Sequence, residues 1–182
     1  MEHITIGVPR GHHPVSWEFF RSLFDAITYL NKEDFTTTLV DVESADIAEN
    51  RNKIWQMWNK GHLLMVDTDM VFPPNAIHRL WMCNKEIVTG FALMGTEPYK
   101  PAIFQGDEFD SFEPKELMEI SGCGMFFILF APQIKSKFSP WPFERREGLS
   151  EDLSFCRLAK LKGIKLWCDP ETKIGHLRLR PI

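Results

Sequence analysis

Short apolar runs alternate with longer amphipathic stretches along almost the whole chain. The apolar runs occupy residues 4–8, 35–40, 63–66, 86–91, 125–130 and 164–168. Runs of this length between turn-forming residues are typical of buried strands. The stretches between them carry apolar residues at helical spacing. This alternation predicts an α/β fold in which helices cover a buried sheet.

The amphipathic stretches predict four helices. Ser16 is placed to cap the first, and Ser44 the second, which is expected to end near Gly61. The third is expected to begin at residues 73–75, and the fourth begins after Ser150 and ends at Gly163. The apolar face of the first helix is formed by Phe20, Leu23, Phe24, Ile27 and Leu30.

The second predicted helix carries a charge on its apolar face. Arg51 lies four residues after Ile47 and three before Ile54, so the three side chains share one stripe. A guanidinium on such a stripe needs a partner. It either pairs with a core carboxylate or reaches the rim, or, together with Asn52, it points at a phosphate or base near the sheet edge.

Two aspartates follow the apolar run at residues 63–66. Asp67 and Asp69, separated by Thr68, are expected to emerge at the carboxyl end of that strand, where open α/β sheets bind ligands. Alternate side chains of an extended segment point the same way, roughly 7 Å apart. Such a pair suits Mg²⁺ or Mn²⁺, with substrate phosphates as further ligands. A turn with two solvated acids is the alternative, because this short motif is weak on its own.

Three further parts of the sequence have to be weighed as candidates for function. Glu151 and Asp152 open the fourth helix, where acids stabilise a first turn by about 0.3–1 kcal/mol without any catalytic role. His176, after Gly175, is either a surface histidine or a metal ligand. Residues 94–121 lose periodicity, and an irregular segment of that length predicts a functional surface.

Composition limits the class of protein. The chain has 182 residues, of which 44% are hydrophobic, enough for one domain with a substantial core. Its net charge of -4 and the absence of a dense Lys/Arg run argue against nucleic-acid binding. No apolar run is long enough to span a bilayer and no signal-like start is present, so a cytoplasmic location is expected. The four widely spaced cysteines are expected to be reduced thiols.

These pieces, in this order, resemble GT-A fold glycosyltransferases, and small family-2-like enzymes most closely. The resemblance covers nearly the whole chain. It is carried by residues 49–52, 66–74, 122–124, 151–163, 169–170 and 175–176. It implies one domain, 1–182, in which a mixed central sheet is flanked by helices. Residues 1–93 would form a nucleotide-binding half and residues 94–182 an acceptor-side half.

The resemblance also implies roles for individual residues. Asp67 and Asp69, with Thr68 between them, would hold Mn²⁺ or Mg²⁺ against the diphosphate of a nucleotide-diphosphate sugar, and His176 would complete the coordination. Asp152, with Glu151 beside it, would face the acceptor as general base. The nucleotide pocket would be lined by Pro9, Arg10, Arg51 and Asn52, and the sugar or acceptor would be bordered by Gly122, Cys123 and Gly124.

The activity that follows is metal-dependent sugar transfer, with inversion of the anomeric centre favoured. The sequence does not decide whether the acceptor is a glycan, a protein or a small molecule. It does not give the oligomeric state either. No Gln-x-x-Arg-Trp sequence follows the acidic helix start, which argues against processive polysaccharide synthesis. Two rivals remain: a nucleotidyltransferase, which would release pyrophosphate, and a sugar- or nucleotide-binding protein without turnover.

Overall fold

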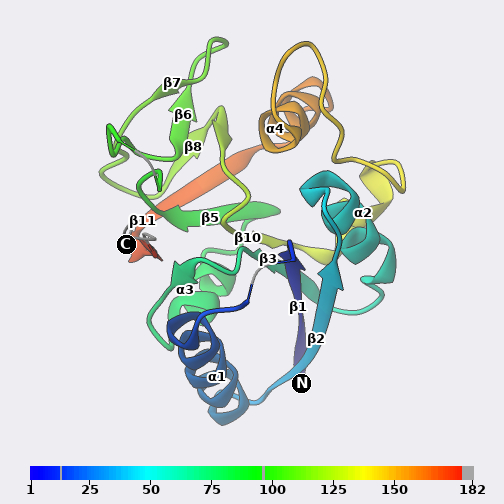
Figure 1. The fold of residues 1–182 in the computed structure, drawn as a ribbon, viewed down its shortest axis with the longest axis vertical. Coiled ribbons are helices and arrows are strands. Elements are labelled where there is room, and N and C mark those ends of the chain that lie inside the picture. Colours follow the sequence, from blue (N-terminus) through cyan, green and yellow to red (C-terminus); the bar gives the residue numbers. More distant parts are fainter. Residues whose placement is uncertain (13, 96, 178–182) are drawn as a thin grey trace.

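A seven-stranded mixed sheet runs through the centre of the protein, in a computed structural model that describes residues 1–12, 14–95 and 97–177 (Figure 1). Its strand order is β2-β1-β3-β10-β5-β11-β8. The strands are β1 (Glu2–Arg10), β2 (Phe35–Glu43), β3 (His62–Val66), β5 (Ile87–Phe91), β8 (Met118–Ile120), β10 (Phe127–Phe130) and β11 (Leu166–Lys173). Two smaller sheets pair β4 (Met70–Val71) with β12 (Gly175–His176), and β6 (Ile103–Gln105) with β7 (Asp110–Ser111) and β9 (Gly122–Cys123).

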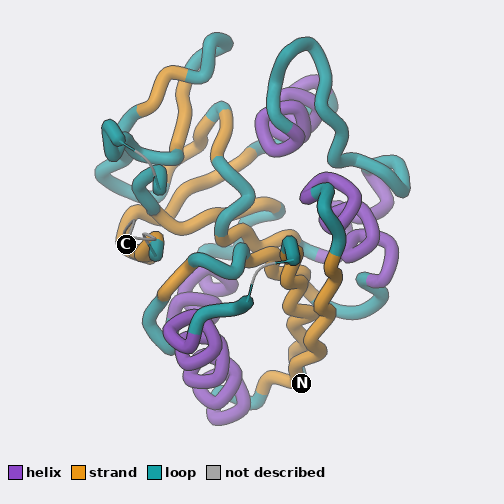
Figure 2. Tube along the Cα trace, viewed as in Figure 1, coloured by secondary structure: helices purple, strands orange, loops and turns teal. Residues whose placement is uncertain are grey.

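Helices cover both faces of the central sheet (Figure 2). They are α1 (Trp17–Lys32), α2 (Ile47–Met57), α3 (Ala76–Met82) and α4 (Glu151–Leu161), with a 3₁₀ helix at Pro132–Lys137. On the side of α1, the Phe72 ring contacts Phe19 and Phe127. On the other side, Trp55 of α2 contacts Phe130 of β10 and Phe155 of α4. The two aromatic clusters fix the helices to opposite faces.

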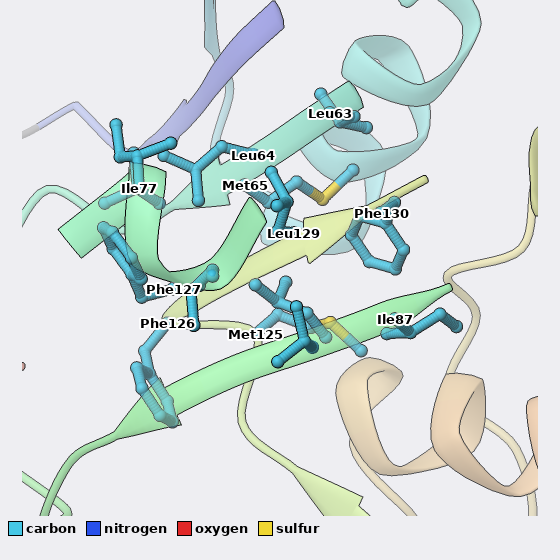
Figure 3. Close-up of a cluster of buried hydrophobic side chains, with 14 of the residues drawn as sticks. Leu63, Leu64, Met65, Ile77, Ile87, Met125, Phe126, Phe127, Leu129 and Phe130 are labelled. Atoms are coloured by element: carbon cyan, nitrogen blue, oxygen red, sulfur yellow. The ribbon is translucent and has the colours of Figure 1, made fainter. Parts of the chain in front are cut away.

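Burial on both faces explains the unbroken apolar runs of the central strands. All four residues at positions 63–66 are buried, as is every residue of β10. Figure 3 shows Leu63, Leu64 and Met65 beside Leu129 and Phe130 of the adjacent strand. A strand covered on both sides has no solvent face, so it shows no polar alternation.

The strand directions determine where a ligand site can form. Strands β1, β2, β3, β5 and β11 run parallel to one another, so their carboxyl ends share one edge of the sheet. Strand β10 lies antiparallel between β3 and β5, and β8 is antiparallel at the far edge. Strands from residues 1–93 and 94–177 are therefore interleaved in one sheet.

Two strands extend past the ends of the apolar runs predicted for them, and each continues through a proline. Strand β1 continues through Pro9 to Arg10 against β2, whereas its pairing with β3 ends at Gly7. Only one side of β1 is hydrogen-bonded at Pro9, so the missing N–H is tolerated. Strand β11 continues through Asp169 and Pro170, where a register shift before Lys173 accommodates the ring.

The second helix differs from its prediction at both ends. Asp46 caps it, accepting from the Ala48 amide at 2.9 Å, whereas the Ser44 hydroxyl is bonded to the Asp46 backbone. The helix ends at Met57 rather than near Gly61, because Trp58 adopts an extended ψ of 114°. The predicted cap of α1 is confirmed, because Ser16 accepts from the Phe19 amide. Ser150 occupies the N-cap position of α4, but its hydroxyl donates to Asp152 rather than accepting from a backbone amide.

The first helix was predicted correctly but its buried face was only partly right. The inward positions are Phe19, Leu23, Ala26 and Leu30. Phe20 and Phe24 are exposed. Ala26 allows close approach to the sheet, so the small residue defines the contact face and the two phenylalanines point outward.

The segment predicted to be irregular, residues 94–121, contains the short strands β6, β7 and β8. The last residues of the predicted acceptor-side half, 178–182, lie outside the described part of the chain. Among the described helices, none has the length and apolar character required to cross a bilayer.

Candidate functional site

Asp67 and Asp69 lie at the carboxyl edge of the sheet, in the turn that joins β3 to β4. The Asp67 amide donates to the Phe126 carbonyl at 3.0 Å, and the Met70 amide donates to the Asp67 carbonyl at 3.3 Å. The side chain of Asp67 is 25% exposed and that of Asp69 is 51% exposed. Thr68 is half-buried between them. Asp69 is therefore the more accessible carboxylate.

His176 contacts Asp69 although the two are far apart in sequence. Strand β12 pairs with β4 so that His176 lies opposite Met70. Its Nε2 is 2.7 Å from Asp69 Oδ2, and its Nδ1 is 3.2 Å from the Leu93 carbonyl oxygen. The hydrogen bond to Asp69 raises the pKa of His176, because a protonated ring can donate to both oxygens.

Gly95 makes this position of the histidine possible. A Cβ on Gly95 would lie 2.8 Å from His176 Nε2, closer than side-chain atoms approach one another. Any larger residue there would displace the imidazole. Sequence patterns did not single out Gly95, because its importance arises only from a contact with the end of the chain.

Arg51 joins Asp67 to the first residue of α4. It is 4% exposed, and its Nη2 lies 3.0 and 3.1 Å from the two oxygens of Asp67. Its Nη1 donates to Glu151, while its Nε has no partner among the described residues. Burial opposes the charge of Arg51, but Asp67 and Glu151 outweigh it and raise the pKa of the guanidinium. The structure thus shows the pairing with core carboxylates, and a contact with ligand stays a prediction.

Asn52 is turned toward the segment that precedes α4. Its Nδ2 donates to the Phe143 carbonyl at 2.7 Å, and its Oδ1 accepts from the Phe143 amide at 3.0 Å. The Phe143 ring stacks on Phe155 of α4 at 4.9 Å. In this arrangement the Asn52 amide fixes the backbone of Phe143 to α2, and the nucleotide contact stays a prediction.

Asp152 directs one of its carboxylate oxygens toward Gly124, the residue that follows β9. Its Oδ1 accepts from the Leu153 amide at 2.8 Å and from the Ser150 hydroxyl. Its Oδ2 would lie 3.7 Å from a Cβ on Gly124. Glu151, beside it, is buried against Arg51. The two acids at this helix start therefore have different surroundings, with Glu151 inside and Asp152 partly exposed.

Gly122 and Cys123 form β9, which packs against α4 next to Asp152. Both are buried in β9, and the Cys156 thiol of α4 donates to the Cys123 carbonyl at 3.6 Å. The hydrogen bond with the Cys156 thiol and burial both raise the pKa of the Cys123 thiol. Cys123 is therefore part of the core beneath the site, with its side chain and backbone both buried.

Pro9 and Arg10 stand at the same sheet edge. The register that pairs Gly7 with Met65 would bring Pro9 level with Asp67. The guanidinium of Arg10 pairs with Asp41 at 2.8 Å and with Glu43. The cation that was predicted to line the nucleotide pocket is thus held by two acids of β2.

Arg145 is a further candidate that sequence reasoning missed. Its side chain is exposed, with Nε 3.8 Å from Glu151 Oε2 and Nη2 3.5 Å from Asp46 Oδ1. Both distances exceed those of strong ion pairs, so this cation is free to turn toward an anion at the edge. The mixed charges of residues 144–147, just before an acidic helix start, are the sequence signal that points to it.

The residues at this edge fit a divalent cation in part. His176 Nε2 lies 2.7 Å from Asp69 Oδ2. A carboxylate oxygen suits Mg²⁺ and Mn²⁺, whereas an imidazole nitrogen is a ligand of transition metals in general. Both oxygens of Asp67 are held by Arg51. No set of three His, Cys, Asp or Glu side chains that could hold a metal occurs within residues 1–12, 14–95 and 97–177. The side chains placed to hold such a cation are therefore two, Asp69 and His176.

The interleaved sheet and its flanking helices define a GT-A glycosyltransferase-like fold, as the sequence predicted. Two solved structures support this. The crystal structure of A197 from STIV is 14% identical, with a TM-score of 0.59, and the match covers 100% of this chain and 96% of that chain. The crystal structure of GalNAc-T7 with UDP, GalNAc and Mn²⁺ is 11% identical, with a TM-score of 0.64.

The match to GalNAc-T7 covers 98% of this chain and 44% of that chain, so this chain spans less than half of that protein. At these identities the likeness is one of fold alone. No family model and no curated protein matches the sequence.

Proposed function

We propose that this protein is a metal-dependent glycosyltransferase of the small family-2-like type, which moves a sugar from a nucleotide-diphosphate sugar to an acceptor. One observation carries the proposal. The Asp69–His176 pair and the Asp67–Arg51–Glu151 bridge bring residues from both ends of the chain to one sheet edge. Asp152 lies directly beside Glu151, so the two candidate ion ligands and a candidate base belong to the same edge of the sheet, which supports the proposal.

Asp69 and His176 would hold Mn²⁺ or Mg²⁺, which stabilises negative charge on the leaving diphosphate. Arg51 keeps Asp67 in place and Arg145 can approach the same charge from the loop. Fixed groups of this kind hold two substrates in attack geometry.

Asp152 would act on the acceptor. The Leu153 amide and Ser150 hydroxyl occupy Oδ1, which leaves Oδ2 to take the proton. As the acceptor O–H bond breaks, its oxygen forms the new bond to the anomeric carbon, and the bond to the diphosphate oxygen breaks. Attack from the face opposite the diphosphate inverts that carbon.

Product analysis tests the reaction class. Incubation with sugar nucleotides and Mn²⁺ is expected to release a nucleoside diphosphate. Release of pyrophosphate instead would identify a nucleotidyltransferase. Binding without release of either product would leave a non-catalytic binding protein. A thermal-shift screen with and without Mn²⁺ identifies the donor class, since a ligand at 100 times its Kd stabilises by about 2.7 kcal/mol.

Asp69→Ala is expected to abolish the Mn²⁺-dependent stabilisation by UDP. The removed carboxylate is the accessible ligand, so the gain of up to about 2.7 kcal/mol at 100 times the Kd is lost. Thermal shift with UDP, in Mn²⁺ and in chelator, measures this. Asp25→Ala is the control, because Asp25 is a similarly exposed aspartate paired with Arg21 on α1. Equal UDP stabilisation of wild type and Asp69→Ala in Mn²⁺ would remove Asp69 from the ion site.

His176→Ala is expected to weaken Mn²⁺ binding in the presence of UDP by roughly tenfold or more, since the imidazole is one of two protein ligands. Calorimetric titration measures the affinity. His12→Ala is the matched control, because His12 also pairs with a carboxylate, Glu43, at 2.8 Å. If both variants bind Mn²⁺ as wild type does, His176 is a structural partner of Asp69 only.

A further inference from the structure

A cavity of about 560 Å³ lies between the turn that joins β6 to β7 and the second half of α4. Its volume falls within the range of small-molecule sites. Asp107 and Phe109 line it from the turn, Ser121 from the chain before β9, and Arg157 and Lys160 from α4. In Figure 1 this turn and α4 form the end of the molecule furthest from α1.

The segment that lines the cavity at Ser121 continues along the chain to Gly124, beside the proposed base. A Cβ on Gly122 would lie 2.7 Å from the Phe109 ring and 3.4 Å from Leu153, and Gly124 faces Asp152. Along α4, Lys160 follows Asp152 by eight residues, which is roughly 12 Å of helix. A molecule with a hydroxyl at Asp152 would therefore reach the cavity with its distant end.

The cavity is lined by two cations and one carboxylate, in a chain whose net charge is -4. Arg157 and Lys160 are three residues apart and so share one face of α4. Arg157 lies over the Phe109 ring at 5.5 Å, which orients its guanidinium. Phe109 has a φ of 56°, a left-handed conformation that is unusual for a bulky residue and that is often found at binding sites.

The present partners of both cations are easily exchanged. Lys160 Nζ is 2.5 Å from Asp107 Oδ1, and Arg157 Nη1 is 2.9 Å from Glu147 Oε2. The side chains of Asp107 and Glu147 are 86% and 74% exposed. Ion pairs with exposed acids contribute little to stability. A ligand anion that meets both cations at once can displace them.

We infer that this cavity binds a negatively charged group, a carboxylate or a phosphate, on the sugar acceptor at a distance from its reacting hydroxyl. The inference rests on the proposed function, because it places the acceptor along α4 from Asp152. The ligand is a sugar that carries an anionic group, and Arg157 and Lys160 bind that group. The donor is not the occupant, since its proposed ion site is formed by Asp69, in the turn before β4, and His176 of β12.

Calorimetric titration with glucuronic acid, glucose 6-phosphate and glucose tests the inference in metal-free buffer. Both acidic sugars are expected to bind wild type at least about tenfold more tightly than glucose, because charge-assisted hydrogen bonds are the stronger ones. The tighter of the two distinguishes a carboxylate from a phosphate. Glucose binding as tightly as both acids would overturn the inference.

Three variants locate the site. Lys160→Gln and Arg157→Gln are each expected to remove most of the preference for the acidic sugars. Asp107→Asn is expected to tighten their binding several-fold, because it frees Lys160. Lys165→Gln is the control, since Lys165 is an exposed lysine paired with Glu119 on β8, and it should change nothing. Unchanged binding in Lys160→Gln and Asp107→Asn would overturn the inference even if Arg157→Gln failed to fold.

A parallel measurement separates this inference from the proposed function. Stabilisation by UDP and Mn²⁺ is expected to be equal in wild type, Lys160→Gln and Asp107→Asn. If UDP and Mn²⁺ stabilise all three but the acidic sugars show no preference, the cavity assignment fails alone. If the acidic sugars bind as expected but no protein responds to any sugar nucleotide, the proposed function fails and the acceptor role fails with it.

Discussion

Arg51→Met is expected to destabilise the protein by about 3–5 kcal/mol. The methionine keeps the apolar stem but leaves Asp67 and Glu151 without their cation. Removing one partner of a buried ion pair leaves an uncompensated charge, which accounts for a loss of this size. Urea unfolding monitored by circular dichroism measures it. The double variant Arg51→Met with Glu151→Gln should recover part of the loss, because one of the two stranded charges is gone.

Arg10→Met is the matched control for this experiment. Arg10, at the end of β1, also pairs with two acids, Asp41 and Glu43 of β2, but the three side chains are more exposed. Its loss should leave the free energy of unfolding nearly unchanged, because exposed ion pairs contribute little. If Arg51→Met unfolds like wild type but binds UDP more weakly, Arg51 serves the ligand and the bridge to Asp67 is secondary.

Asp152→Asn is expected to lower the transfer rate by about two to four orders of magnitude. The amide cannot take the acceptor proton, and positioned general bases contribute about 10²–10⁴-fold. Its oxygen can still accept from the Leu153 amide, so the helix start should change by no more than about 1 kcal/mol. Release of nucleoside diphosphate from the donor, with water or an added sugar as acceptor, measures the rate. UDP and Mn²⁺ binding should persist.

Glu18→Gln is the control for the loss of a first-turn acid. Glu18 occupies the first turn of α1, as Asp152 does in α4, but on a different helix. It should leave the transfer rate unchanged. A rate for Asp152→Asn within a few-fold of wild type would leave Asp152 as a helix-start residue, and Glu151 or a substrate-assisted retaining mechanism would be tested next.

The helices and strands could be predicted from the sequence because the signals for them are local. The unbroken apolar run at residues 63–66 requires burial on both faces, and Ser16 and Gly163 mark helix ends through their own backbone preferences. The buried face of α1 was harder to predict from the sequence. Phe20 and Leu23 are equally apolar, and only packing against the sheet decided that the first is exposed.

The candidate site also combines features that the sequence predicted with contacts that it did not. Its acids could be named in advance, because Asp67 and Asp69 follow a buried strand and Asp152 opens a helix. Their partners could not. Arg51 meets Glu151 across 100 positions of sequence, and His176 meets Asp69 across 107. No local pattern encodes contacts of that range.

By itself, then, the sequence determined the alternation of strands and helices, the GT-A-like order of motifs and the carboxylates at the sheet edge, since each depends on neighbours along the chain. Only the tertiary structure decided which groups meet. The antiparallel β10 between β3 and β5, and the pairing of β12 with β4, set those contacts. Both depend on strand pairings between distant segments, whose free energy comes from packing the whole sheet rather than from any one motif.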